Sequence, residues 1–276
     1  MSTSTASDNI TAHFIQNVDA EALEQKVKKM YKDVAERPKE EFHFEMGREM
    51  AERLGYPAET LETIPSAAID SFAGVGYYFH YADLQAGESV VDLGSGSGMD
   101  TFFAARKVGT SGRVVGIDMT DEQLKKANTL RDKSKINNVS YTKSYIQDTP
   151  FDSGSFDAVI SNGVVNLAPS KVDVFKEAAR LLKPGGRLAL ADIVTETRLP
   201  EGITCNATLW AACIGGALQQ DDYLDAIREA GFIIEQVQDN PEYRFISDSA
   251  QGATQTYGVK SISVLARKPV GPFSLI

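Results

Sequence analysis

Three alternating glycines mark the stretch of this sequence that is best suited to bind a ligand. Gly94, Gly96 and Gly98 follow the β-branched run "SVVDL" and precede the helical run "MDTFFAA". Glycine lets the chain turn sharply and lets a ligand lie against the backbone with no Cβ between them. The free N–H groups at the start of the next helix favour a carboxylate or a phosphate. We therefore predict a ligand-binding turn between a strand and a helix.

A pair of aspartates indicates what that ligand is. Asp118 ends the next β-branched run, "RVVGID", 20 residues after Gly98, where an acidic residue reaches the hydroxyls of a ribose. Asp92 lies just before the first glycine, where it would repel a pyrophosphate but can accept hydrogen bonds from an ammonium group. A ribose, an ammonium and a carboxylate occur together in S-adenosylmethionine. A nicotinamide dinucleotide, the alternative, fits the glycine spacing and Asp92 poorly.

These residues must be positioned by the elements around them, and the pattern of the chain predicts a sheet. Short apolar runs alternate with helical stretches from residue 88 to residue 192, which implies a parallel, doubly wound sheet with right-handed crossovers. We predict an α/β fold of the Rossmann-like type, with a mostly parallel seven-stranded sheet. The predicted strands are 89–93, 113–118, 139–143, 156–161 and 187–194, followed by apolar runs at 232–237 and 261–266; the predicted helices are 98–109, 120–135, 169–183 and 221–232.

Local signals define some of the helix ends and the boundaries of the regions. Thr120 and Gln123 have the spacing of a capping box, and Asp221 or Asp222 is expected to begin the last predicted helix. We expect a polar tail at 1–17, a helical cap at 18–84 and a ligand-binding domain at 85–270 with a cap insert at 196–220. Such caps would cover an acceptor pocket and exclude water from it.

Composition excludes several classes of function. The chain has 276 residues with 28 basic and 38 acidic side chains, and its net charge of −10 disfavours non-specific nucleic-acid binding. Its two cysteines form no disulfide framework, and His13 and His43 suggest no metal site. There is no apolar run of 18 residues and no leader, so we expect a cytoplasmic protein without a membrane span. The oligomeric state stays open.

Several motifs resemble the class I S-adenosylmethionine-dependent methyltransferases over Glu88 to Phe232. They are "VVDLGSGSG", "VVGIDMTDEQLKKA", "IQDTPFDSGSFDAVISN" and "LLKPGGRLALAD", in this order. The resemblance implies that S-adenosylmethionine is the cofactor and assigns its contacts. Asp92, Gly94, Gly96 and Gly98 would hold its methionine moiety and Asp118 its ribose; Met119, Ile146 and Gln147 would contact the adenine, and Ser161 and Asn162 would line the sulfonium side.

A closer resemblance is to the arsenite methyltransferases. It is carried by "ISNGVVNLAPSKVDVFKEAARLLKPGGRLALADIV" and by "LWAACIGGAL". Those enzymes hold arsenic with thiolates from three separate segments, as a soft element requires. Here Val75, Gly163 and Val165 stand at positions where cysteine is expected. Cys213 is the cysteine that remains at a matching position, and Cys205 corresponds to no position in the resemblance. The resemblance therefore implies the scaffold and the cofactor of that branch with a different acceptor.

Aromatic residues replace the first cysteine segment and are candidates for catalysis. Tyr77, Tyr78 and His80 in "GVGYYFHY" are expected to face the cleft, where aromatic rings stabilise a cation and a histidine acts as a general base. Packing of a cap helix is the alternative role of these residues, and Cys213 is either a ligand of the acceptor or a buried thiol.

We predict a methyltransferase of small molecules, with Tyr78, His80 and Cys213 as candidate catalytic residues. An arsenite or thiol methyltransferase that uses Cys213, and a non-catalytic S-adenosylmethionine-binding protein, are the alternatives.

Overall fold

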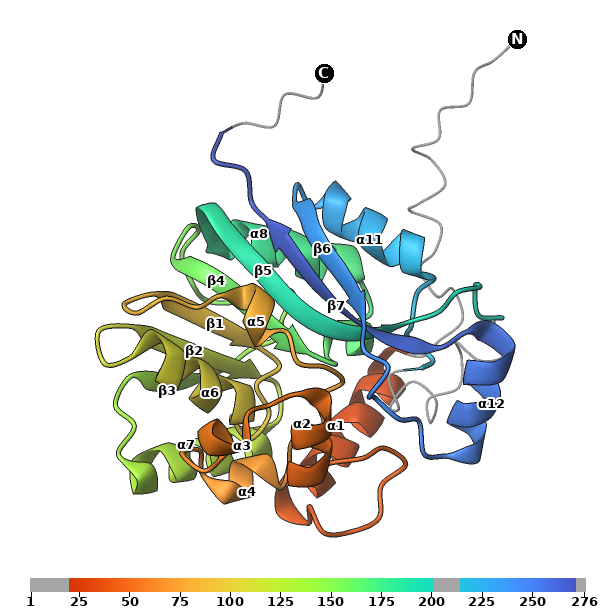
Figure 1. Cartoon of the computed structure of the whole chain (residues 1–276), viewed down its shortest axis with the longest axis horizontal. Helices are drawn as coiled ribbons and strands as arrows, with labels where there is room; N and C mark the ends of the chain where they lie inside the picture. The colour runs from red at the N-terminus through yellow and green to blue at the C-terminus, as the bar shows by residue number, and fades with distance from the viewer. Residues whose placement is uncertain (1–19, 201–213, 272–276) are drawn as a thin grey trace.

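A single sheet organises the part of the chain that the computed structural model describes, residues 20–200 and 214–271. Its seven strands lie in the order β3-β2-β1-β4-β5-β7-β6 (Figure 1). Neighbours among β1 to β5 are parallel, and β7 runs antiparallel between β5 and β6. The predicted fold class is confirmed. The strands are β1 Ser89–Leu93, β2 Arg113–Asp118, β3 Val139–Lys143, β4 Phe156–Asn162, β5 Leu182–Val194, β6 Ile233–Asp239 and β7 Lys260–Arg267.

Helices precede β1 and lie in the connections between the later strands, except for the loop between β3 and β4. One of them, α12, was not predicted, because its buried residues are the small Ala250 and Ala253 and they give no apolar stripe. The described helices are α1 Ala20–Glu36, α2 Arg48–Leu54, α3 Ala58–Leu61, α4 Ser66–Ile69, α5 Phe79–Ala82, α6 Met99–Val108, α7 Asp121–Ser134, α8 Lys171–Leu181, α11 Gln220–Glu229 and α12 Asp248–Tyr257, with a 3-10 turn, η3, at Val165–Leu167. None of these helices is long and apolar enough to cross a membrane.

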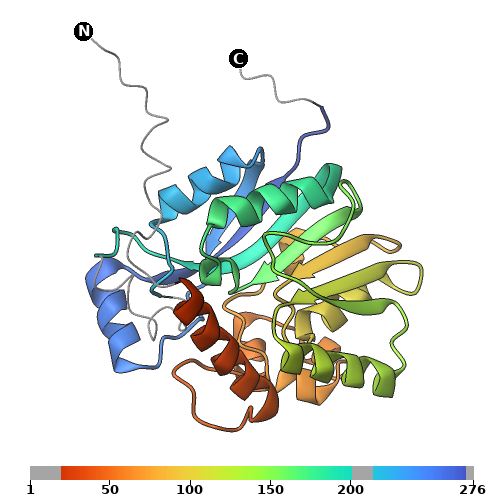
Figure 2. The same ribbon diagram turned by 180° about the vertical axis from the view of Figure 1, so that it is seen from behind.

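Alternating side chains of the strands build one core on each face of the sheet. Val90 of β1 belongs to the core that contains Phe103 of α6 and the aromatic residues of the N-terminal helices. Val91 belongs to the opposite core, under α8 and α11, which lie side by side over that face (Figure 2). The β-branched strands are therefore buried on both faces, as a parallel sheet covered by helices requires.

Two predicted helix starts are wrong in their detail. Thr120 precedes α7, but its side chain caps no N–H group, and Gln123 does not complete a capping box. Gln123 instead accepts a hydrogen bond from Ser97 and donates one to the backbone of Tyr31. The start of α11 is capped by Gln219, which accepts from the N–H groups of the two residues after Gln220. At α7 the expected capping residue Gln123 bonds to distant residues instead, and at α11 Gln219 caps the helix in place of the expected aspartates.

A buried arginine fastens the N-terminal helical region to the sheet. Arg187 of β5 is 8% exposed and donates to both carboxylate oxygens of Glu88, at 2.9 and 2.6 Å. It also donates to the carbonyl oxygens of Ala82 and Asp83, at the end of α5. The segment from Val75 to Ala82 thus crosses the sheet from its carboxyl end, beside Asn162, to its amino end, beside Arg187.

Replacing Arg187 with Met should destabilise the fold by about 3 kcal/mol, because it leaves a largely buried carboxylate and two carbonyl groups without a partner. Urea denaturation followed by circular dichroism measures the loss. Arg228→Met is the matched control, since Arg228 pairs with Asp225 on the surface; it should cost less than about 0.5 kcal/mol. Equal losses for the two variants would contradict the anchoring role of Arg187.

Candidate functional site

A cavity opens where the carboxyl ends of β1, β2 and β4 meet. Its described lining comes from the glycine turn after β1, from Asp118 to Gln123 after β2, and from Asn162 after β4. Three further segments close it: α1, the stretch 68–74 and the loop 144–147. Ligands of doubly wound sheets bind at this edge. The topology thus brings the predicted site residues of distant segments to one place.

The glycines of the turn are required by space as well as by conformation. Gly94, Gly96 and Gly98 have φ angles of +75°, +52° and +95°, which L-residues with side chains rarely adopt. A Cβ on Gly94 would lie 2.4 Å from the side chain of Val164, and one on Gly98 would lie 2.1 Å from the hydroxyl of Tyr141. Gly94 and Gly96 line the cavity, whereas Gly98 does not. Gly98 lets α6 begin against Tyr141, and its contact with the ligand stays a prediction.

Asp118 joins the end of β2 to the glycine turn. One carboxylate oxygen accepts from the N–H of Thr120 at 2.8 Å and the other from the N–H of Gly96 at 3.0 Å. Burial raises the pKa of Asp118, and these backbone hydrogen bonds oppose the rise. Each oxygen keeps a lone pair for a hydroxyl group in the cavity. The side chain therefore fits the ribose-binding role predicted for it.

The cavity lining also contains buried polar groups that lack a counter-charge. Asp92 is 2% exposed and accepts a hydrogen bond from Thr101 at 2.6 Å. Burial raises the pKa of Asp92, and the neighbouring carboxylate of Asp100 raises it further. The hydroxyl of Ser95 is buried with no partner in the described structure. No lysine, arginine or histidine occurs in the described lining. These groups fit a ligand that carries an ammonium or sulfonium charge, as S-adenosylmethionine does.

The end of β4 is arranged differently from the sequence prediction. Asn162 lines the cavity, but its side chain is engaged: Oδ1 accepts from the N–H groups of Val75 and Gly76, and Nδ2 donates to Asp100 and Tyr56. Ser161 is 1% exposed and donates to the carbonyl of Leu93, outside the cavity lining. Ser161 therefore faces away from the described lining, because alternate residues of a strand face opposite sides, and its place beside the sulfonium stays a prediction without support from this geometry.

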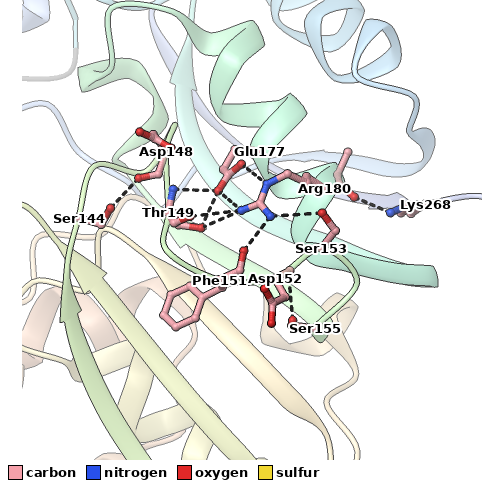
Figure 3. A network of polar contacts seen from close by, with 11 residues as sticks. Ser144, Asp148, Thr149, Phe151, Asp152, Ser153, Ser155, Glu177, Arg180 and Lys268 are labelled. Carbon is pink, nitrogen blue, oxygen red and sulfur yellow. Dashed lines mark hydrogen bonds and ion pairs between the residues drawn. The ribbon is translucent and has the colours of Figure 1, made fainter.

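The loop after β3 supplies the wall of the cavity predicted to bind adenine. Ile146 and Gln147 line the cavity beside Met119, so the residues predicted for adenine lie together. This loop is held on α8 by a network that Figure 3 shows. Glu177 accepts from the N–H and the hydroxyl of Thr149, and Arg180 donates to Glu177 and to the carbonyl of Phe151. Burial alone would raise the pKa of Glu177, but these hydrogen bonds outweigh it and hold the pKa below its usual value.

The loop 163–169 forms another wall, through Val164, Leu167, Ala168 and Pro169. A buried acid behind it fixes its position. Asp192, which is 0% exposed, accepts from the N–H and the side-chain amide of Asn166, at 3.1 and 2.8 Å. It also accepts from the hydroxyl of Tyr223 at 3.1 Å. Lys171 donates to the carbonyl groups of Asn166 and Ala168. Burial raises the pKa of Asp192 to about 6, although its hydrogen bonds oppose the rise.

Tyr77, Tyr78 and His80, which we expected to face the cleft, lie outside the described lining of the cavity, and their catalytic role stays a prediction. Tyr78 is fully buried and donates its hydroxyl to Asp100 at 2.9 Å, while His80 is exposed and stacks on Tyr77. The physical reason is the path of the chain, which leaves the carboxyl end of the sheet at Val75 and reaches the amino end by Ala82.

The structure describes the positions where cysteine is expected but not the two cysteines of the chain. Cys205 and Cys213, the candidate thiols, lie outside the described residues. The positions where the arsenite methyltransferase resemblance expects cysteine are adjacent in space, since a Cβ on Gly163 would lie 3.2 Å from a methyl group of Val75. This place is occupied by apolar side chains and backbone. Among the described residues no group of three His, Cys, Asp or Glu side chains could hold a metal ion.

Several residues of the cavity were not predicted from the sequence. Asp100 lies two residues after Gly98, and this spacing was the signal available for it. Glu24, Val27 and Tyr31 of α1 also line the cavity. Their helical spacing was visible in the sequence. The face that they share contacts both the core and the cavity, so no local signal tells a core residue from a cavity residue there.

The sequence matches known proteins over most of the region that builds this cavity. Residues 84–231 match the methyltransferase domain family. An arsenite methyltransferase of Halobacterium salinarum is 38% identical over 220 residues, which cover 79% of this chain and 56% of that protein. An arsenite methyltransferase of Homo sapiens is 38% identical over 52% of this chain and 40% of that protein. The chain thus spans about half the length of these curated relatives.

A solved structure gives a similar result. The arsenic(III) S-adenosylmethionine methyltransferase of Chlamydomonas reinhardtii has a TM-score of 0.61 and 27% identity, and the match covers 83% of this chain and 76% of that one.

Asp192 should make the stability of the protein depend on pH. Its pKa is raised, so the folded state holds the proton more tightly than the unfolded state, and stability falls as the pH rises from about 4 to about 6. A shift of about two units corresponds to about 3 kcal/mol. We therefore compare the free energy of unfolding of the wild type with that of Asp192→Asn, which cannot titrate at this position. The value for the wild type should fall by about 3 kcal/mol relative to the variant between about pH 4 and pH 7.

Denaturant titrations at several pH values measure this difference. Tyr223→Phe is the matched control, because it removes one hydrogen bond that lowers the pKa of Asp192 and keeps the buried acid, so its stability should still fall with rising pH, at least as steeply as that of the wild type. A difference between the wild type and Asp192→Asn that does not change with pH would contradict the assignment.

Proposed function

The chain belongs to the methyltransferase domain family, with S-adenosylmethionine as its cofactor, and we propose that it transfers a methyl group from this cofactor to a small-molecule acceptor. Bound S-adenosylmethionine supplies a methyl group that its sulfonium charge activates for in-line displacement. The chain's own residues have three tasks: to bind and orient the donor, to position the acceptor and to exclude water.

One observation supports this proposal above the others: the residues fitted to the donor and a separate, more apolar wall share one cavity. Asp92 and Asp118 lie on the donor side. Val27 of α1, Phe72 and Leu167 line the same cavity from segments that the glycine turn does not include. A wall of this kind suits the body of a small acceptor, and α1 limits the access of water. A protein that only binds S-adenosylmethionine would need no second wall.

The acceptor side favours a small molecule rather than a nucleic acid. The net charge of −10 and the absence of a cationic side chain from the described lining both oppose the binding of a phosphate backbone. No histidine lies in the described lining either, so the described lining offers no imidazole that could act as a general base. An acceptor that is already nucleophilic at neutral pH suits this cavity best.

Arsenite is the acceptor that the relatives' names suggest, and the arrangement of residues argues against it. In those resembling enzymes the metalloid needs converging thiolates. Here Val75 and Gly163 occupy neighbouring positions where thiols would be needed, and neither can coordinate arsenic. Cys213 and Cys205 alone supply fewer thiols than a clamp of three requires. We therefore propose a different acceptor.

The donor site is tested by Asp118→Ala. The loss of two charge-assisted hydrogen bonds costs on the order of 2–4 kcal/mol, so S-adenosylmethionine affinity should fall by roughly 30- to 1000-fold. Titration calorimetry with S-adenosylmethionine, and with NAD as a negative ligand, measures this. Asp121→Asn is the matched control, because Asp121 lies nearby on the surface and pairs with Lys143. An unchanged dissociation constant in a folded Asp118→Ala protein would refute the ribose assignment.

The acceptor is tested by product analysis with labelled donor over thiols, amines, phenols, carboxylates and arsenite. With arsenite, tested with and without glutathione, we expect no methylarsenical above background in the absence of added thiols, because thiolates are missing at the positions of Val75 and Gly163. Transfer to one of the organic acceptors would support the enzyme over the binding protein. Rapid methylation of arsenite that Cys213→Ser abolishes would show that the arsenite alternative is correct.

A further inference from the structure

Three side chains join helix α1 to the loop after β3 at the edge of the cavity. The hydroxyl of Tyr145 donates to Oε1 of Glu24 at 2.7 Å. The ammonium of Lys28 donates to the same carboxylate oxygen at 2.5 Å and to the Tyr145 hydroxyl at 3.0 Å, and it lies 5.1 Å from the centre of the Tyr145 ring. Glu24 of α1 and Tyr145 of the loop both line the cavity. We call these three residues the α1 latch.

The C-terminal half of α1 is fastened to the body of the protein by other, less exposed contacts. Gln123, which is 1% exposed, donates to the carbonyl of Tyr31 at 2.8 Å. Lys126 donates to the carbonyl of Ala35 at 3.0 Å and to the hydroxyl of Ser71 at 2.7 Å. Gln123 and Lys126 belong to α7, which follows β2 and so is fixed to the sheet. This end of α1 is therefore anchored beside the donor side of the cavity.

The N-terminal half of α1 has no comparable anchor in the part of the chain that the structure describes. There, Tyr145 is the residue outside the helix with which residues 20–28 form hydrogen bonds. The latch side chains are 35–41% exposed, so water competes for their polar groups. Val27 is 1% exposed, but it lines the cavity and belongs to neither core of the sheet. An element held in this way opens locally at a low cost in free energy.

We propose that the N-terminal half of α1 is the gate through which the donor enters the cavity and its product leaves, and that the α1 latch sets how often this gate opens. The inference rests on the proposed function, which assigns the ligand. α1 lies against α7 at the carboxyl end of the sheet (Figure 2), so it covers the side where Asp118 and Met119 are expected to hold the nucleoside. The loop 144–147 is held on α8 through Thr149, so the helix is the partner that moves.

A gate and a ligand contact have different effects on binding kinetics. The latch joins protein atoms to protein atoms and includes no atom of the ligand. If it is weakened, the open state is visited more often, and both the association and the dissociation of the ligand become faster by the same factor. Their ratio, the dissociation constant, then stays unchanged. The loss of a direct ligand contact instead raises the dissociation rate and weakens the affinity.

The test measures the association and dissociation rate constants of S-adenosylhomocysteine by surface plasmon resonance on the full chain. Tyr145→Phe keeps the ring and removes the hydroxyl that bonds to both Glu24 and Lys28. Both rate constants should rise by about two- to fivefold, with a change of less than about twofold in the dissociation constant. Lys32→Met is the matched control, because it breaks an exposed ion pair between α1 and Glu122 in the anchored half of the helix. It should leave both rate constants unchanged.

The outcomes separate this inference from the proposed function. If the wild type binds neither S-adenosylhomocysteine nor S-adenosylmethionine, the proposed function itself fails. If the wild type binds them and Tyr145→Phe raises the dissociation rate alone, Tyr145 is a ligand contact; the gate is then overturned and the proposed function stands. Unchanged rate constants in Tyr145→Phe, or an equal rise in Lys32→Met, would also overturn the gate.

Hydrogen exchange of the wild type tests the gate without a variant. The amides of residues 24–28 should exchange at least about tenfold faster than those of residues 32–36, because the first half of the helix opens while the second stays anchored. Raising the salt concentration from about 0.01 to 1 M screens the ion pair between Glu24 and Lys28 and should accelerate exchange at residues 24–28 alone. Equal protection along the helix, or exchange at residues 24–28 that does not respond to salt, would overturn the inference.

Discussion

The structure depends on one constraint, the glycine turn between β1 and α6. Its three residues have positive φ angles, and two of them lie where a Cβ would overlap Val164 or Tyr141. Because the turn is this close to its neighbours, α6 begins directly at the carboxyl edge of the sheet. The carboxylates of Asp92 and Asp100 are thereby buried on either side of the turn, and Asp118 is tied to it through the N–H of Gly96. The polarity of the site follows from this packing.

Two further walls of the cavity are irregular segments, and each is held from behind by a buried charged side chain. Glu177 and Arg180 hold the loop after β3, and Asp192 and Lys171 hold the loop 163–169. Such networks fix a loop only when nearly every donor and acceptor in them is satisfied, and these are close to that state. The cavity therefore has walls whose shape is set by the rigid part of the fold, which suits a reaction that depends on positioning.

The neutral network around Asp100 differs from these anchors. In the anchors an arginine or a lysine faces the buried acid or the loop that it holds, whereas Asp100 meets two tyrosines and an asparagine. The same three residues also close the gap between the N-terminal segment and the end of β4, through Asn162 and the backbone of Val75. The residues that orient the Asp100 carboxylate in the cavity therefore also contribute to the stability of the fold, because they join the N-terminal segment to the end of β4.

The sequence by itself determined the strands β1 to β5, the glycine turn and the place of Asp92 and Asp118, because periodicity and turn chemistry are local properties. It could not decide which side Ser161, Tyr78 and His80 face, since the side to which a strand residue or a crossing segment turns depends on what packs against it. Beyond its spacing from Gly98 it gave no sign of the surroundings of Asp100, whose partners Tyr56 and Asn162 are 44 and 62 residues away in the chain. Only the tertiary structure decided which polar residues share the cavity, because burial and the absence of a counter-charge are properties of the packed molecule.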